Sequence, residues 1–174
     1  MSPKPTFWQS LDANAERWLL LVFYAMIVAT IVVEVLRRFV LSYSSLWGEE
    51  VARYAFIYLA WVGASAAVKE RAHIRIDVLL HIVPRRVKAL LYLLGDFCML
   101  ALACVALYTS IESVLTSLRF GSVTHGLRIS LVWFLAAVPL GFSLMTYRLL
   151  QSIRRDFADL VQGRPVYEGG KLFD

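Results

Sequence analysis

Ionisable residues that could do chemistry are few in this chain. Thirteen Asp and Glu and three His residues occur among 174 positions, and most of them stand between long apolar runs. Asp96 is the deepest acid, about two helical turns inside the third run. A carboxylate within a membrane span is a candidate cation or proton site, but no second acid follows it at helical spacing. The pattern therefore favours a packing role for Asp96, in which it bonds to a neighbouring helix or reaches toward water, over ion binding.

The other reactive side chains form no recognisable centre. His73, His81 and His125 all fall outside the apolar runs, which disfavours a haem subunit because such subunits hold haem with histidines well inside their spans. Cys98 and Cys104 are six residues apart, on different helix faces, and are expected to be buried free thiols. No metal-ligand spacing, phosphate loop or nucleophile–base motif occurs. The sequence predicts a protein that is not an enzyme and binds no cofactor.

Charged residues near the run ends have structural explanations. Glu49 and Glu50 precede Arg53 by four and three residues, so all three can share one face of a helix's first turn. There the acids would favour the helix dipole and pair with the arginine. The alternative is that these groups bind the polar surface of a partner. Glu34 stands one turn before Arg37 and predicts a local ion pair.

Four apolar runs define the fold class. The chain is 59% hydrophobic, with a mean hydropathy of +0.64 and only 18% charged residues. Each run is long enough to cross a bilayer as a helix. We predict an all-α integral membrane protein with four spans and short amphipathic interfacial helices. The expected spans are about 18–36, 51–68, 89–111 and 129–150, preceded by an amphipathic segment (1–17) and followed by a cytoplasmic tail (151–174).

The basic residues report topology. Of the eighteen Lys and Arg residues, thirteen lie before the first span, between spans two and three, or after span four. The positive-inside rule then places both termini in the cytoplasm of a bacterial inner-membrane protein. The net charge of +5 thus reflects orientation in the membrane and does not indicate nucleic-acid binding.

The segments around the spans carry further expectations. Residues 1–17 form either an interfacial helix, with Asp12 and Glu16 on its polar face, or the start of the first span. Residues 74–83 are expected to form a second interfacial helix, separated from span three by Pro84. We expect a polar outer loop over 112–128 and a kink in the fourth span at Pro139.

Small residues form a stripe on the second span. They recur at three- and four-residue spacing: Ala60, Gly63, Ala64 and Ala67. Small side chains allow another helix to approach closely in lipid, although alanine is also simply common in such helices. The stripe is a candidate contact face, and Gly63→Leu is expected to disrupt association with a partner.

Several motifs together resemble one known family. Arg38-Phe39, Trp47-Gly-Glu-Glu-Val-Ala-Arg53, Gly63-Ala64 and His73-Ile74-Arg75-Ile76-Asp77 resemble the small membrane subunit (DctQ family) of tripartite ATP-independent periplasmic (TRAP) transporters. The resemblance covers roughly residues 17–150. Its specific parts are the aromatic-acid-acid-x-x-Arg entry to the second span and the His-Ile-x-x-Asp exit.

The resemblance implies a scaffold role without catalysis. Such systems take up organic acids with a sodium gradient, and the large membrane subunit holds the sodium and substrate sites. The small subunit would brace that large subunit, contact membrane lipid and help dock the periplasmic substrate-binding protein transiently. Trp47, Glu49, Glu50 and Arg53 would lie at the periplasmic boundary, and His73 and Asp77 at the cytoplasmic one. The alternatives are a redox membrane anchor that binds quinone or haem, and an autonomous homo-oligomeric exporter.

Overall fold

The computed structural model describes residues 7–43, 45–70 and 84–162, and these residues are almost entirely helical. The helices are α1 (Phe7–Val40), α2 (Leu46–Lys69), α4 (Arg85–Phe120), α5 (Val132–Leu135) and α6 (Ala137–Gln162). Helices α1, α2 and α4, and α5 with α6 together, are each long and apolar enough to cross a membrane. The predicted four-span, all-α class is confirmed. The expectations for His73, Asp77, His81, residues 1–6, 74–83 and 163–174 lie outside the described residues.

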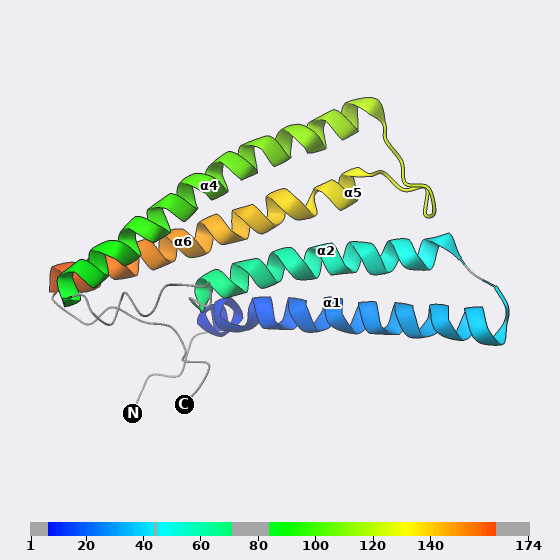
Figure 1. The fold of residues 1–174 in the computed structure, drawn as a ribbon, viewed down its shortest axis with the longest axis horizontal. Helices are drawn as coiled ribbons and strands as arrows, with labels where there is room; N and C mark the ends of the chain where they lie inside the picture. Colours follow the sequence, from blue (N-terminus) through cyan, green and yellow to red (C-terminus); the bar gives the residue numbers. More distant parts are fainter. Residues whose placement is uncertain (1–6, 44, 71–83, 163–174) are drawn as a thin grey trace.

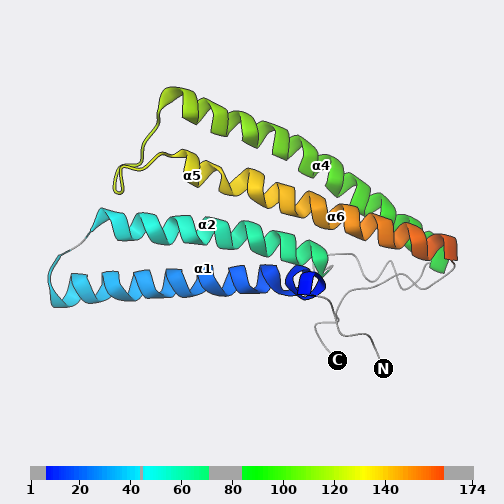
Figure 2. The ribbon, with the colours of Figure 1, turned by 180° about the vertical axis from the view of Figure 1, so that it is seen from behind.

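The helices form a single layer in the order α1, α2, α6, α4 (Figures 1 and 2). Helix α6, the last in the chain, lies between α2 and α4, and α1 and α4 are the two edges. At one end of the layer, here called the terminal end, α2 ends at Lys69, α6 ends at Gln162 and α4 begins after Pro84. The other, the hairpin end, holds the turn between α1 and α2 and the loop 121–131. Such a layer leaves two broad faces uncovered by the chain itself.

Helix α1 packs on α2 along a narrow seam. Its buried and half-buried positions alternate at spacings of four and three residues: Glu16, Leu20, Phe23, Ile27, Thr30, Glu34 and Arg37. That average spacing of 3.5 is the pattern of two helices packed side by side with a small crossing angle. Nothing in the apolar window of α1 is buried. The first helix is therefore attached to the layer along one face only.

Close packing in the middle of the layer joins α2, α4 and α6. The buried apolar core comprises Val68, Ala103, Met145 and Leu149. Nearby, Gly141 of α6 lies so close to α2 that an added Cβ would stand 2.6 Å from the Trp61 Cβ. The rings of Trp61 and Phe142 are 4.7 Å apart. A glycine is required here because the two helices approach closely.

The structure corrects the expected ends of α4 and α6. Helix α4 continues to Phe120, so residues 112–120 of the expected outer loop are helical, and Gly121 ends the helix with φ 58°. Its N–H bonds to the Leu118 carbonyl, as in a left-handed C-terminal cap. Helix α6 runs on to Gln162, so the first part of the predicted tail is also helical.

The regular helix of the fourth span is interrupted close to Pro139, the position of the predicted kink, toward the hairpin end of the span. Helix α5 ends at Leu135 and α6 begins at Ala137. Pro139 has no N–H to donate to the Leu135 carbonyl, and its ring crowds that oxygen. The regular ladder is interrupted there and resumes with the bond from the Leu140 N–H to the Ala136 carbonyl.

The expected thiol environment is half right. Cys98 and Cys104 are free, as predicted, but both are exposed on α4. They lie on faces of the layer that no other part of the described chain covers. Burial would need neighbours on several faces of α4, whereas α4 is the edge of an open layer.

Candidate functional site

A buried charged cluster fastens three helices at the terminal end. The Glu16 cluster comprises Glu16 of α1, Ser65 and Lys69 of α2, and Arg148 of α6. The Arg148 Nε donates to Glu16 Oε1 at 2.7 Å, and the Lys69 Nζ lies 3.4 Å from Oε2. The Ser65 hydroxyl donates to Oε1 at 3.3 Å. One carboxylate of α1 thus binds side chains of both α2 and α6.

Burial makes this cluster costly to disturb. Glu16 is 4% exposed and Arg148 6% exposed, so neither charge is solvated by water. A buried ion pair is tolerated only when its geometry is good and further hydrogen bonds satisfy its polar atoms. The Arg148 guanidinium also donates to the Gln151 side chain at 2.8 Å. The cluster therefore holds α1 and α2 in a fixed position relative to α6.

The sequence pattern does not predict the Glu16 cluster. Of the two alternatives for residues 1–17, a polar face of an interfacial helix does not hold for Glu16, whose side chain is buried between three helices. The second alternative, the start of the first span, agrees with a span that contains Glu16 (Asn14–Val40). In the sequence, Arg148 is only a topology signal. The available clue was that Glu16 and Leu20 begin the four-and-three spacing along α1. An acid on the packing seam of a span requires a cation from another helix.

Asp96 bonds to a neighbouring helix, as predicted. The Ser152 hydroxyl of α6 donates to Asp96 Oδ2 of α4 at 2.8 Å, and both side chains are buried. One turn further along α6, Asp156 is fully buried and its Oδ1 lies 3.8 Å from the Arg155 Nε. Polar bonds thus also join α4 to α6 at the terminal end.

At the hairpin end, a second cluster closes the turn between α1 and α2. Glu34 pairs with Arg37 at 3.6 Å, which confirms the predicted local ion pair. The Ser45 hydroxyl donates to Glu34 and accepts from the Arg37 guanidinium at 3.2 Å. The same guanidinium lies over the Tyr43 ring at 4.8 Å and the Trp47 ring at 5.2 Å. Arg37 therefore orients Trp47 at this end of the layer.

Glu50 binds the loop between α4 and α5. Its carboxylate accepts hydrogen bonds from the Leu127 N–H at 2.6 Å and the Gly126 N–H at 3.3 Å. The expected pairing with Arg53 is wrong, since no ion pair joins Arg53 to Glu49 or Glu50. Backbone N–H groups without partners in a tight loop bind the nearest carboxylate more effectively than a solvated arginine does.

Two further contacts hold the fourth span and the loop. The Tyr58 hydroxyl of α2 donates to the Trp133 carbonyl of α5 at 2.7 Å. A Cβ on Gly126 would stand 2.9 Å from the Leu46 carbonyl oxygen, so this loop position requires glycine. Glu49 and Arg53 are exposed. At the hairpin end, the loop and the fourth span are thus held largely by bonds to backbone groups, whereas side chains around Arg37 hold the turn between α1 and α2.

The residues of the small-residue stripe have different surroundings in the structure. Ala64 packs inside the chain against the apolar core, whereas Ala60 is exposed. Gly63 and Ala67 line a groove between α1 and α2. The chain itself therefore uses part of the stripe, and contact of the remainder with a large subunit stays a prediction.

The polar contacts between distant parts of the described chain join helices to one another or to loops. Within that part of the chain, no group of three or more His, Cys, Asp or Glu could hold a metal ion. The carboxylates that lie inside the layer bind a serine, an arginine, a lysine or backbone N–H groups of the same chain. This geometry supports a rigid plate of helices.

Four apolar spans fastened into one layer define a multi-span membrane protein. The family model described as "Tripartite ATP-independent periplasmic transporters, DctQ component" matches residues 15–159. The chain therefore belongs to the DctQ family of TRAP transporter components. The resemblance seen in the sequence is confirmed, and a redox anchor is not favoured.

Named relatives agree with the family. The chain is 26% identical over 140 residues to the sialic acid TRAP transporter small permease protein SiaQ of Vibrio cholerae, covering 80% of each. It is 31% identical over 97 residues to the C4-dicarboxylate small permease protein DctQ of the same organism, covering 56% of this chain and 42% of that protein.

One longer relative matches over part of its length. The chain is 28% identical over 159 residues to the isethionate TRAP transporter permease protein DctMQ of Oleidesulfovibrio alaskensis. That match covers 88% of this chain but only about a quarter of the relative. The rest of that permease has no counterpart in the residues of this chain.

Proposed function

We propose that this chain is the small permease subunit of a sodium-coupled secondary transporter for organic acids. It acts as a static, non-catalytic scaffold for a large transport subunit in the bacterial inner membrane. The observation that carries the proposal is the single layer of helices, which buried polar bonds fasten at its terminal end. The match of the chain to the DctQ family supports it.

The exposed apolar surface supports a large partner. The edge helix α4 exposes bulky side chains along its length, among them Leu90, Leu94, Phe97, Leu102 and Val105. In lipid, such surface gains nothing from burial alone, so a partner binds through close packing and polar contacts. A flat plate offers more area for such packing than a closed bundle of the same length.

The proposed orientation places the hairpin end in the periplasm and both termini in the cytoplasm, as the positive-inside rule indicates. Trp47, Glu49 and Arg53 are exposed at the hairpin end. These side chains would contact a substrate-binding protein that docks transiently. The relatives named for isethionate, sialic acid and C4-dicarboxylates suggest the organic acids to test.

Transport by reconstituted subunits tests the proposal. The chain, the large subunit and both together are reconstituted into proteoliposomes with the cognate binding protein. Sodium-driven uptake of isethionate, sialic acid or C4-dicarboxylates is then measured. We expect uptake only when both subunits are present, and co-purification of the two from detergent. Uptake by this chain alone would overturn the scaffold assignment.

A matched pair of variants tests the proposed docking surface for the binding protein. Arg53→Ala at the hairpin end is expected to weaken the response to binding protein while leaving co-purification intact. Arg154→Ala removes an equal charge from an exposed position on α6 near the terminal end and serves as the control. Equal behaviour of the two variants would remove Arg53 from the docking surface.

A further inference from the structure

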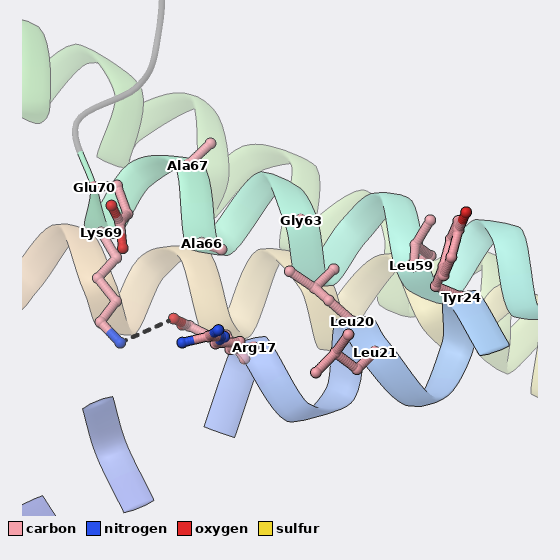
Figure 3. Close-up of a pocket in the computed structure, with 11 residues that line it drawn as sticks. Arg17, Leu20, Leu21, Tyr24, Leu59, Gly63, Ala66, Ala67, Lys69 and Glu70 are labelled. Carbon is pink, nitrogen blue, oxygen red and sulfur yellow. Dashed lines mark ion pairs between the residues drawn. The ribbon is translucent and has the colours of Figure 1, made fainter. Parts of the chain in front are cut away.

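A groove between α1 and α2 is open to the surroundings near the terminal end of the layer (Figure 3). Its volume is about 710 Å³. Apolar side chains, among them Leu20, Tyr24 and Leu59, line most of it, and Gly63, Ala66 and Ala67 leave space on the α2 side. Inside a membrane, such a space must be filled by a lipid chain or by another protein.

Charged side chains line one end of the groove. Arg17, Lys69, Glu16 and Glu70 lie there, and Figure 3 shows Arg17 and Lys69 at one end with Leu59 and Tyr24 at the other. The Glu16 carboxylate is already matched by Lys69 and by the buried Arg148, which does not itself line the groove. No ion pair joins Arg17 to another residue that the structure describes. The Arg17 guanidinium is therefore the cation of this end that can pair with an anion from outside.

We propose that this groove binds an anionic phospholipid, with its phosphate beside Arg17 and Lys69 and an acyl chain along Leu20, Tyr24 and Leu59. Basic pockets between membrane helices on the cytoplasmic side are suited to anionic head groups. The apolar part of the groove runs from that charged end toward the middle of the span, as an acyl chain does. The proposal rests on the orientation proposed above, with the terminal end in the cytoplasm, and not on the scaffold role.

The length of the groove suits an acyl chain. Its α2 lining extends from Leu59 to Glu70, about three helical turns. Three turns rise about 16 Å, which is roughly half the hydrocarbon thickness of a bilayer and so the depth of one leaflet. An acyl chain that lies between α1 and α2 spans that depth.

Photo-cross-linking tests the proposal with the full chain. The protein is reconstituted in phosphatidylcholine vesicles that contain phosphatidylglycerol with a diazirine in its acyl chain. Mass spectrometry then locates the labelled peptides. We expect labelling of α1 and α2 around Tyr24 and Leu59, competed by unlabelled phosphatidylglycerol but not by inorganic phosphate.

Variants separate the charge from the space. Loss of one cation in Arg17→Gln should weaken competition by phosphatidylglycerol about fivefold, whereas Arg154→Gln, on an exposed site of α6, should not. Ala66→Leu should fill the groove and abolish labelling. Ala101→Leu, at an exposed position of α4, is its control.

Three outcomes would overturn the proposal. One is equal labelling by diazirine-bearing phosphatidylcholine. Another is unchanged competition in Arg17→Gln, which is an exposed substitution and does not threaten folding. The third is cross-linking of a photoreactive residue at Leu21 to the large subunit in place of lipid, which would assign the groove to protein contact.

Discussion

Apart from the side-chain cluster around Arg37 at the α1–α2 turn, the two ends of the helix layer are held by different kinds of bond. At the terminal end, side chains of α1, α2 and α6 bind one another through Glu16, and α4 binds α6 through Asp96 and Ser152. At the hairpin end, Glu50 and Tyr58 bind backbone groups of the loop and of α5. The first arrangement fixes helices relative to one another, whereas the second mainly fixes connecting segments.

This difference predicts which parts of the structure a substitution at either end should loosen. Breaking a bond between buried charges should loosen whole helices, because an unmatched charge remains between them. Breaking a bond to a loop should release that loop and leave the helices in place. The following variants test the contrast, from the largest expected effect to the smallest.

Arg148→Met should have the largest effect. It leaves the Glu16 carboxylate buried with only Lys69 as a cation, which should lower the free energy of unfolding by about 3 kcal/mol. Unfolding by sodium dodecyl sulfate in mixed micelles measures this change. The exposed Arg154→Met is the matched control, and the double variant Glu16→Gln/Arg148→Met should recover part of the loss. Equal stability of the two arginine variants would contradict the role of the cluster.

Gly141→Ala tests the middle of the layer, between the two ends. The new Cβ would lie 2.6 Å from the Trp61 Cβ, and overpacking of this kind costs about 2 kcal/mol. The same substitution at Gly95 meets nothing within 4 Å and should stabilise α4 by up to about 1 kcal/mol. Thermal unfolding in detergent should therefore shift in opposite directions. A shift of the same sign in both would argue against a tight crossing.

Tyr58→Phe removes the hydroxyl that binds the Trp133 carbonyl at 2.7 Å. The expected loss is about 1 kcal/mol, with greater mobility of α5 than of the Glu16 cluster. Hydrogen exchange of the amides near Trp133 reports the local change. Tyr108→Phe, at a position that is 75% exposed on α4, should alter neither quantity.

Glu50→Ala should have the smallest effect on global unfolding. Loss of the carboxylate frees the Gly126 and Leu127 N–H groups, so amide exchange at these two residues should rise several-fold while the helices stay protected. Glu49→Ala alters the exposed neighbouring acid and should leave the loop unchanged. Global unfolding as severe as that of Arg148→Met would remove the distinction between the two ends.

Sequence reasoning found the helices because hydropathy and length determine spans in a bilayer. It also found the Glu34–Arg37 pair and the break before Pro139, since both follow from spacing along one chain. The order of the helices was beyond reach, because apolar side chains facing lipid and those facing a neighbouring helix have similar composition.

The contacts of the candidate site were predicted only for side chains whose partner is close in sequence or that had few possible partners. The Asp96 prediction succeeded because a lone buried acid must find a partner on another helix. Glu16 and Glu50 failed because their partners are 132 and 77 residues away in the chain. Spacing within one helix therefore suggested that Glu16 could face solvent and that Glu50 would pair with Arg53.

The place of α6 between α2 and α4 has a consequence for synthesis in the membrane. The hairpin of α1 and α2 can assemble as soon as it leaves the ribosome. Helix α4, however, packs mainly against a segment that is translated after it. Until α6 is inserted between α2 and α4, helix α4 therefore lacks its main packing partner in the bilayer. During that time Asp96 faces lipid or an insertion factor.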